Sequence, residues 1–416
     1  MELKPRCHEK IMHLIEKGVD IPNPLTLDIG DEVNVDRISS HKVKIFPGCR
    51  IYGKDTLISS GTQLGREGTV TIENCQIGRN VELKGGYFSK SVFLDKANMG
   101  FGAHVREGSI LEEEAGGAHC VGLKQTILFP FVTLGSLINF CDCLMAGGTS
   151  RKDHSEVGSS YIHFNFTPDG DKTTASLIGD VPRGVMLNQP AIFLGGQGGI
   201  VGPVRMGFGN VVAAGTVLRE DCTSDNMLIP GKVPSGSVKD YRRALYPNLA
   251  RVVENNIIYL ANLAALKEWY IHVRRPFLAG TEFGELIHAG LLDKLSLGRA
   301  ERLKRLEAMA RQASAEQPPV SGKAAAQRRE LGSAMGKVQE VFEGNDYLDS
   351  ESNAWRDAFL RELEKARQGG AGTYVETIQG LGLDVSATGT KWLQGVVDSC
   401  CRAVSAAMPG LELFRK

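Results

Sequence analysis

One aliphatic side chain recurs every sixth residue across the middle of the chain. Ile200, Met206, Val212 and Leu218 form one such run. An α-helix repeats its buried face every 3.6 residues and a strand every 2, so neither explains this period. Hexapeptide repeats are typical of a parallel β-helix, in which three hexads form a triangular coil of about eighteen residues. Further runs are Ile45, Ile51, Leu57; Ile58, Leu64, Val70; Met99, Val105, Leu111; and Leu128, Leu134, Phe140. We expect a β-solenoid; the alternative is a β-sandwich with chance spacing.

The composition narrows the class of protein further. Lysine plus arginine and aspartate plus glutamate both number 48, so no net charge favours binding to nucleic acid or to an anionic membrane. No run of eighteen apolar residues occurs, so we expect no membrane span. The nine cysteines are odd in number and form no pair of CxxC motifs, which predicts reduced thiols, no metal and a cytoplasmic protein.

The periodicity divides the chain into three parts. Residues 1–29 are expected to form a short N-terminal helical segment, and residues 30–240 the β-helix. From about residue 241 the apolar period becomes helical, which predicts an all-α C-terminal region over 241–416. This last region contains no motif that we can connect with chemistry.

Coil arithmetic brings distant side chains together. Arg106 and Lys124 are eighteen residues apart, and Asp142 is eighteen residues further on, so the three are expected to form a column on one face. Two cations one coil apart can hold a phosphate through charge-assisted hydrogen bonds. The alternative is a structural ladder in which Asp142 neutralises Lys124. Coil geometry alone does not separate these two interpretations.

The least regular stretch of the middle region, residues 147–180, is predicted to be a loop that leaves the prism. His154 or His163 is a candidate general base near neutral pH. A ring of His163 stacked between Ile162 and Phe164 is the alternative. The stretch also holds Asn165, Asp169 and Lys172. Asn165 lies between two phenylalanines, and a buried amide there would need hydrogen-bond partners.

The segment "LGGQGGIVGP" (194–203) has five glycines in ten residues. It lacks the GK[ST] of a phosphate loop and the helix that follows a dinucleotide fingerprint. Two interpretations remain open: a corner where a cofactor lies against bare backbone, or a run of tight prism corners.

A family resemblance becomes visible between about residues 100 and 240. The segments that carry it are "VREGSILEEEAGGAHCVGLKQ", "HFNFTPDGDKTTASLIGD", and "GPVRMGFGNVVAAGTVLRED" followed by "IPGKVP". They resemble the left-handed β-helix acetyltransferase domain of bifunctional N-acetylglucosamine-1-phosphate uridyltransferases, and also stand-alone UDP-N-acetylglucosamine pyrophosphorylase-like proteins. The resemblance implies a left-handed coil, acetyl-CoA or another acyl-CoA as co-substrate, and a homotrimer.

The resemblance also implies roles for individual residues. Arg106 and Lys124 match the pair that holds the sugar phosphate, which favours the phosphate site over the ladder. The family's substrate loop corresponds to Asn165, Phe166, Asp169 and Gly170, its second phosphate-binding lysine lies near Lys172, its CoA arm lies against Ala213 and Ala214, and Lys232 replaces an arginine near the CoA phosphates.

The departures from the family pattern concern catalysis. Ser136 occupies the place of the family's catalytic histidine, and Asn139 that of a nearby tyrosine. A serine alone is a poor acceptor for an ammonium proton at neutral pH. Either His154 or His163 has therefore taken over the role, with Asn165 beside it, or transfer is lost. The first hundred residues contain no "GxGTRM"-like opening, so we expect no nucleotidyltransferase domain.

Two functions remain in view. The first is an acyl-CoA-dependent acyltransferase acting on a sugar phosphate or nucleotide sugar such as a UDP-N-acetylglucosamine relative. The second is a non-catalytic sugar-nucleotide-binding or assembly module derived from such an enzyme. A trimeric metal hydratase on the same fold would need three histidines at coil spacing, which His104, His119, His154 and His163 do not show.

Overall fold

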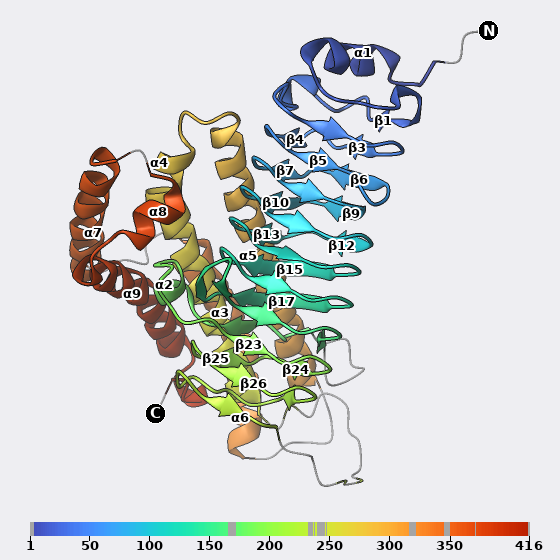
Figure 1. The fold of residues 1–416 in the computed structure, drawn as a ribbon. Coiled ribbons are helices and arrows are strands. Elements are labelled where there is room, and N and C mark those ends of the chain that lie inside the picture. The colour runs from blue at the N-terminus through green and yellow to red at the C-terminus, as the bar shows by residue number, and fades with distance from the viewer. Residues whose placement is uncertain are drawn as a thin grey trace.

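The structure is a computed structural model of the 416-residue chain. It describes residues 4–164, 172–231, 248–315, 322–344, 350–370 and 372–414, and the single positions 236, 238 and 246. The chain forms a tall β-solenoid, capped by a helix at its N-terminal end and flanked by helices along one side (Figure 1). The predicted fold class, a β-helix with a short N-terminal helix and an all-α C-terminal region, is confirmed.

The solenoid has three faces, which we call A, B and C in the order in which each coil visits them. Face A is a ten-stranded parallel sheet. Its strands are β2 (Lys44–Ile45), β5 (Gln63–Leu64), β8 (Glu82–Leu83), β11 (Asn98–Met99), β14 (Gly116–Gly117), β16 (Thr133–Leu134), β20 (Glu156–Val157), β23 (Phe193–Leu194), β26 (Val211–Val212) and β28 (Leu228–Ile229).

Faces B and C are joined where two long strands turn a corner without a break. Face B consists of β1 (Asp28–Ile29), β3 (Arg50–Tyr52), β6 (Val70–Glu73), β9 (Gly86–Ser89), β12 (Ala103–Val105), the first halves of β15 (Gly122–Leu128) and β17 (Asn139–Met145), β21 (Ile162–Phe164), β24 (Gly199–Val201) and β27 (Val217–Leu218). Face C consists of β4 (Leu57–Ile58), β7 (Gln76–Ile77), β10 (Ser91–Phe93), β13 (Ser109–Leu111), the second halves of β15 and β17, β22 (Ser176–Ile178) and β25 (Arg205–Met206).

The hexads place one aliphatic side chain on each face of a coil. Met99, Val105 and Leu111 lie on β11, β12 and β13, and all three are buried. The other residues of these runs are buried too, and most stack into columns on coils about 4.8 Å apart. Leu57 and Val70 are exceptions, because Leu57 lies in register with Gln76 and Val70 with Gly86, whereas the columns run through Ile58 and Ile72. The six-residue period therefore arises from one inward side chain per face of the prism.

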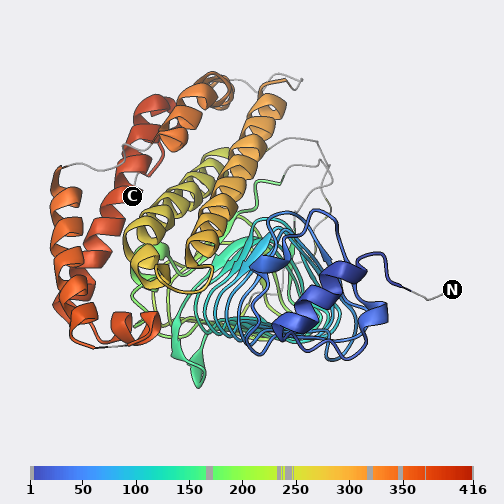
Figure 2. The ribbon, with the colours of Figure 1, turned by 90° about the horizontal axis from the view of Figure 1, so that it is seen from above.

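The coils are not uniform in length. Lys124 lies in register with Cys141, seventeen residues on, whereas Val105 lies in register with Leu123, eighteen residues on. The prediction that residues 147–180 form one loop outside the prism is only partly right, because β20, β21 and β22 lie on faces A, B and C and the chain leaves the prism between β17 and β20. After β17 the chain forms a short antiparallel hairpin, β18 (Gly148–Ser150) and β19 (Asp153–His154), which projects from the corner between faces C and A. Figure 2, a view down the coils, shows this hairpin standing clear of the stack.

The helices occupy the two ends of the sequence and one connection. They are α1 (His8–Lys17), α2 (Val181–Gly184), α3 (Leu249–Trp269), α4 (Arg275–Leu278), α5 (Gly284–Ala315), α6 (Lys323–Glu343), α7 (Ser350–Gln368), α8 (Tyr374–Gln379) and α9 (Leu383–Ala407), with short 3₁₀ segments η1 (Pro24–Thr26), η2 (Val35–Arg37) and η4 (Pro409–Leu411) and a π-helical turn η3 (Tyr270–Arg274).

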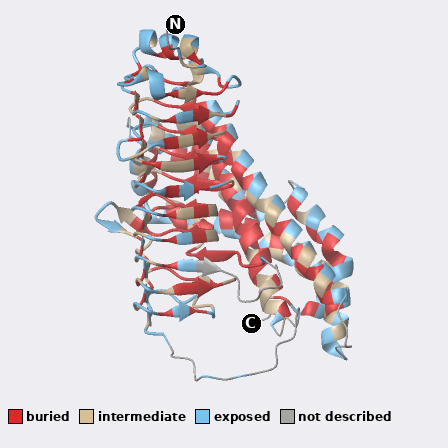
Figure 3. Cartoon of the chain, turned by 90° about the vertical axis from the view of Figure 1, so that its right-hand side faces the viewer, coloured by how far each residue is buried: buried red, intermediate tan, exposed pale blue. Residues whose placement is uncertain are grey.

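The C-terminal helices cover face C. Helix α5 packs on β7, β10 and β13, and α3 packs on β22, so the helical layer buries one side of the solenoid (Figure 3). Polar side chains fix the contact: Asn262 accepts a hydrogen bond from Val181 N at 2.9 Å, and Asn256 donates to Thr173 O at 3.0 Å. Faces A and B carry the candidate site residues described next.

Candidate functional site

Arg106 and Lys124 lie one above the other on consecutive coils, as the spacing predicts. Strand β12 pairs with β15 so that Val105 faces Leu123, and Arg106 N donates to Leu123 O at 2.8 Å. Both residues lie at the corner between faces B and C. Arg106 is exposed and Lys124 is half-buried, so both cations can reach a ligand on face B.

The prediction that Asp142 is the third residue of this column is wrong. Cys141 lies in register with Lys124, because this coil is one residue shorter than eighteen. Asp142 occupies the next position, a left-handed corner with φ 56°. Its carboxylate forms an ion pair with Arg302 of α5 at 2.8 Å and accepts a hydrogen bond from the Thr174 hydroxyl at 3.2 Å. Asp142 therefore holds the helical layer in place and does not neutralise Lys124.

Lys124 instead pairs with Glu107, with Nζ 2.9 Å from the carboxylate. Glu107 follows Arg106 directly, so the acid and the two cations share one corner. A phosphate bound between Arg106 and Lys124 would compete with this carboxylate for the lysine. The pair is partly exposed to solvent, which keeps that competition modest.

Cys141 places a thiol beside the two cations. The thiol donates to Asn139 Oδ1 at 3.2 Å. Burial and the neighbouring Asp142 raise the pKa of the Cys141 thiol to about 11, although Arg106 and Lys124 act in the opposite direction. The thiol is therefore protonated at neutral pH, and a role as a thiolate nucleophile is not indicated.

Lys172, which belongs to the predicted loop 147–180, lies near the same corner. Its backbone carbonyl accepts a hydrogen bond from Arg302 at 2.6 Å, and its side chain is exposed. Because Arg302 also binds Asp142, Lys172 lies just beyond Arg106 and Lys124 on the corner between faces B and C. The structure thus brings Arg106 and Lys124 together and places the backbone of Lys172 beside Arg302. A role for the Lys172 side chain stays a prediction, and Asp169 lies outside the described residues.

His154 lies elsewhere on the solenoid. It belongs to the β18–β19 hairpin at the corner between faces C and A, and its Nδ1 is 3.0 Å from Arg151 O. Arg106 and Lys124 lie at the corner between faces B and C. Within one chain, His154 and the cation pair therefore occupy different corners.

The other predicted catalytic residues are only partly described. The backbone of His163 lies in β21, where it pairs with Ile200, a residue buried inside the prism. Asn165 and Lys232 lie outside the described residues, so their roles as a catalytic and a cofactor-binding residue stay predictions.

His119, which the sequence suggested only as a possible metal ligand, lies beside Ser136. His119 Nδ1 is 2.9 Å from the Ser136 hydroxyl, and the two residues occupy adjacent coils at the corner between faces A and B. They are seventeen residues apart, so a search for coil partners at a fixed spacing of eighteen misses the pair. A search that allowed one residue of slip would have found it.

His119 and Ser136 lie at one edge of face B, and Arg106 and Lys124 at the other. The strand that joins the two edges, β17, carries Asn139, whose side chain is exposed. Gly122 faces Asn139 on the coil below and has no side chain, and the exposed His104 faces Gly122 one coil further down. The cation pair and the Ser136–His119 pair therefore lie at opposite edges of the same face.

Ala213 and Ala214 lie at the corner between faces A and B, above Ser136. The face A register runs from Leu134 through Val157 and Leu194 to Val212, so the corner column above Ser136 is Ser159, Gly196 and Ala214. Ala214 is exposed. The predicted cofactor corner is therefore continuous with the Ser136–His119 pair.

Close packing between coils explains glycines in the segment "LGGQGGIVGP". A Cβ on Gly195 would lie 2.5 Å from Ala214 N, and one on Gly198 would lie 2.7 Å from Thr216 O. The coils approach too closely at this corner for any side chain. Tight prism corners therefore account for Gly195 and Gly198 without a ligand.

The described residues show no sign of two other kinds of site. Within the described ranges, no group of three or more His, Cys, Asp or Glu side chains is placed to hold a metal ion. No described helix is both long enough and apolar enough to cross a bilayer.

Together, the hexad-built coil and its register define a hexapeptide-repeat β-solenoid protein with two stacked cations, Arg106 and Lys124, at one edge. Searches of the curated proteins find relatives named bifunctional protein GlmU. The relative from Thermotoga maritima is 28% identical over 214 residues, which are 51% of this chain and 42% of that protein. The relative from Trichlorobacter lovleyi is 27% identical over 221 residues, 52% of this chain and 42% of that protein.

These matches confirm the resemblance seen in the sequence, over about half of the chain. The chain spans about two-fifths of the length of the curated relatives it matches. No protein-family model matches the chain.

Proposed function

We propose that the solenoid is an acyl-CoA-dependent acyltransferase that acts on a sugar phosphate or a nucleotide sugar. The observation that carries this proposal is the stacking of Arg106 and Lys124 on consecutive coils, on the same face as the Ser136–His119 pair. The similarity to bifunctional protein GlmU over the solenoid half supports it.

The cations at the corner between faces B and C hold the acceptor. Arg106 offers a planar fork of N–H donors to a phosphate, and Lys124 offers a point charge one rung away. Lys172, whose backbone carbonyl accepts a hydrogen bond from Arg302, is the proposed third cation of this site. The phosphate displaces Glu107 from Lys124 as it binds.

The Ser136–His119 pair accepts the proton of the acceptor. In the tautomer with a bare Nδ1, the Ser136 hydroxyl donates to His119. The acceptor N–H or O–H passes its proton to Ser136 Oγ while the serine proton moves to His119, and the acceptor atom attacks the thioester carbon. The C–S bond then breaks, and the thiol leaves with the proton held by His119. This relay gives Ser136 the base that it lacks alone.

The acyl donor lies along the corner between faces A and B. Ala214 lies three rungs above Ser136, about 14 Å at the spacing of parallel strands. A pantetheine arm laid over Ser159 and Gly196 brings its thioester down to Ser136. Lys232 remains a predicted contact for the CoA phosphates.

A homotrimer with a cytoplasmic location completes the proposal. Face C is covered by helices, whereas face A exposes an in-register apolar column of Phe193, Val211 and Leu228. Such a column favours contact with another copy. Light scattering in solution measures the assembly: a trimer mass supports it and a monomer mass contradicts it.

The cysteines support the proposed cytoplasmic location. None of the nine cysteines, all within the described ranges, forms a disulfide, which supports a reducing compartment.

The second candidate is a binding or assembly module without turnover. One observation favours it: Ser136 occupies the position where the resemblance implies a catalytic histidine. In this candidate the cation pair still binds a nucleotide sugar, and His119 has no catalytic role.

One experiment tests both candidates. The protein is incubated with acetyl-CoA and a panel of amino-sugar phosphates and UDP-sugars, and free thiol is followed against Arg106→Ala, His119→Gln, His154→Gln and His163→Ala variants. Acceptor-dependent thiol release that is lost in Arg106→Ala and His119→Gln supports the acyltransferase. Binding by calorimetry without thiol release supports the module, and binding that is unchanged in Arg106→Ala contradicts both.

A further inference from the structure

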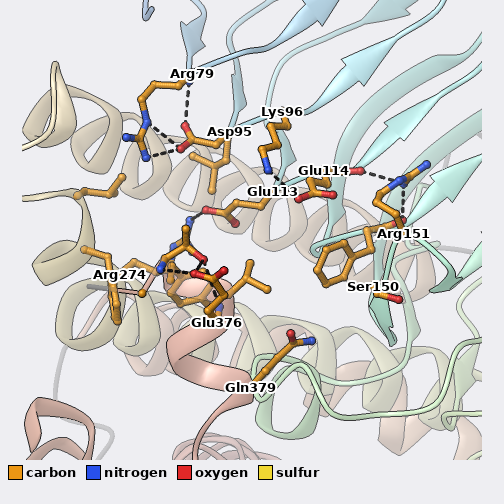
Figure 4. A pocket seen from close by; sticks show the side chains of 18 of the residues that line it. Arg79, Asp95, Lys96, Glu113, Glu114, Ser150, Arg151, Arg274, Glu376 and Gln379 are labelled. Carbon is orange, nitrogen blue, oxygen red and sulfur yellow. Dashed lines mark hydrogen bonds and ion pairs between the residues drawn. The ribbon is translucent and has the colours of Figure 1, made fainter. Parts of the chain in front are cut away.

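A cavity of about 720 Å³ lies between the solenoid and the helical layer, at the corner between faces C and A. The solenoid wall includes Arg79, Lys96, Glu113 and Glu114, and the hairpin contributes Arg151 (Figure 4). The opposite wall comes from η3, α4 and α8. Its volume falls within the range of small-molecule sites. It lies at a different corner from Arg106 and Lys124.

Arg274 forms the deep wall of this cavity. Its side chain is 1% exposed, and its ion pair with Glu113 joins the helical layer to the solenoid. The ring of Tyr374 lies against the guanidinium, with its centroid 3.7 Å from Cζ, and the Tyr374 hydroxyl accepts a hydrogen bond from Trp269 Nε1 at 2.9 Å. These contacts fix the plane of the guanidinium.

The Arg274–Glu113 contact leaves polar atoms without partners. Among the described residues, Arg274 Nε, Arg274 Nη1 and Glu113 Oε2 are buried and make no hydrogen bond. A buried polar group without a hydrogen-bond partner lowers stability, and a charged group lowers it further. An ion pair that served only to join the two layers would be expected to use both edges of the guanidinium.

The other charges around the cavity are largely paired. Arg79 pairs with Asp95, and Lys96 pairs with Glu114 at 3.3 Å. Arg151 donates to two backbone carbonyls and to the Thr133 hydroxyl. Recognition at this cavity therefore depends on the unsatisfied donors of Arg274 rather than on a net positive field.

Part of the remaining lining is apolar, and the rest is polar or charged, including Ser150, Lys152, Glu282 and Glu376. Phe131 comes from the solenoid, and Phe277, Leu278 and Ile287 come from the helical layer. These side chains offer contact to the body of a ligand whose charged end faces Arg274. The combination of one deep cation and an apolar wall is typical of sites for organic anions.

We propose that this cavity binds a small organic anion of about nucleotide size, whose carboxylate or phosphate oxygens accept hydrogen bonds from Nε and Nη1 of Arg274 after the side chains that cover these two buried atoms move aside. The site lies between the two parts of the chain, so its ligand stabilises the docking of the helical layer on the solenoid. It is separate from the proposed acyl-transfer site and does not depend on it.

Ligand binding raises the thermal midpoint of unfolding, because it stabilises only the folded state. Midpoints are measured with inorganic phosphate, citrate and uridine monophosphate as probes, each against sodium chloride at equal ionic strength. Calorimetry gives the dissociation constant of each probe. We expect at least one probe to raise the midpoint by a few degrees, and the Arg106→Ala/Lys124→Ala variant to retain that rise.

Two variants remove the site in different ways. Glu113→Gln/Arg274→Gln removes both charges together, and we expect it to abolish the rise. Val375→Trp fills the cavity and leaves Arg274 in place, so it keeps the test valid if the first variant does not fold. We expect it to weaken binding at least tenfold. Val385→Trp on α9, a partly buried valine outside the lining, controls for the added bulk.

The proposal is overturned if no probe raises the midpoint above the chloride reference. It is also overturned if Val375→Trp binds the probe as tightly as the unaltered chain. A crystal structure grown with the probe gives the same decision directly. Probe oxygens at Arg274 support the site, and ordered water alone at Nε and Nη1 contradicts it.

Discussion

Glu107 and Lys124 form an ion pair of 2.9 Å at the corner where Lys124 stacks on Arg106. The acid therefore acts as an internal competitor for any phosphate bound by the two cations. Removing the charge of Glu107 should raise the affinity for a phosphorylated ligand, whereas removing the charge of Lys124 should lower it.

Glu107→Gln should tighten binding of a phosphorylated acceptor about two- to fivefold, because partly exposed ion pairs contribute up to about 1 kcal/mol. Lys124→Ala should weaken the same binding about 10- to 100-fold, since charge-assisted hydrogen bonds contribute about 1.5–3 kcal/mol. Calorimetry with a UDP-sugar measures both changes. A loss of affinity in Glu107→Gln would show that the acid itself contacts the ligand.

The Ser136–His119 pair predicts a selective loss of turnover. Ser136→Ala and His119→Gln should each lower kcat about 10²- to 10⁴-fold, the range of general acid–base catalysis, with KM nearly unchanged. Both side chains are at least partly exposed, so the thermal midpoint should change little. His154→Gln, at another corner, is the matched control and should keep full activity. Full activity in His119→Gln, with loss of activity in His154→Gln or His163→Ala, would show that the general base is His154 or His163 of the predicted loop.

The Asp142–Arg302 ion pair should contribute to the free energy of unfolding, because it joins the helical layer to the solenoid. Arg302 is 2% exposed, so Arg302→Leu leaves Asp142 without its charged partner at a nearly buried position. We expect the free energy of unfolding to fall by about 3–5 kcal/mol in urea denaturation. Lys365→Ala breaks an exposed pair with Glu362 on α7 and should change it by less than about 1 kcal/mol. Equal effects of the two substitutions would contradict this assignment.

Glu112 predicts a pH dependence of stability. Burial raises the pKa of its carboxyl to about 7, although Arg274 partly offsets this, and Tyr270 Oη lies 2.5 Å from Oε1. The folded chain therefore retains a proton that the unfolded chain loses near pH 4.5. The contribution of Glu112 to the free energy of unfolding should fall by about 3 kcal/mol as the pH rises from about 4.5 to 7.

Glu112→Gln keeps a neutral hydrogen-bonding side chain at this position. Its free energy of unfolding in urea should therefore fall less steeply between pH 5 and pH 8 than that of the unaltered chain. Parallel pH profiles for the two proteins would show that Glu112 stays ionised when buried.

Much of the solenoid was predictable because its period is local. Ile200, Met206, Val212 and Leu218 each lie on successive faces, and the spacing of Arg106 and Lys124 contains no insertion. One missing residue between Lys124 and Cys141 was enough to exchange Asp142 for a cysteine in the column. Errors of this kind arise because the prediction assumes eighteen residues in every coil. A coil can lose one residue at a corner without any change in the order of its apolar residues, so the sequence pattern does not reveal the shift.

Contacts between the two halves of the chain were beyond sequence reasoning. Arg302 reaches Asp142 across 160 positions, and Arg274 reaches Glu113 across 161. No local pattern records which face of the prism the helices cover. The His119–Ser136 contact was missed for the milder reason that the search assumed one fixed coil length.

The most direct test of the acyl-transfer site is a crystal structure with a UDP-amino sugar bound. We expect phosphate oxygens within hydrogen-bond distance of both the Arg106 guanidinium and Lys124 Nζ, and the reacting group of the sugar facing Ser136 and His119. A ligand bound at another face, or Arg106 and Lys124 both without contact to phosphate, would contradict the account.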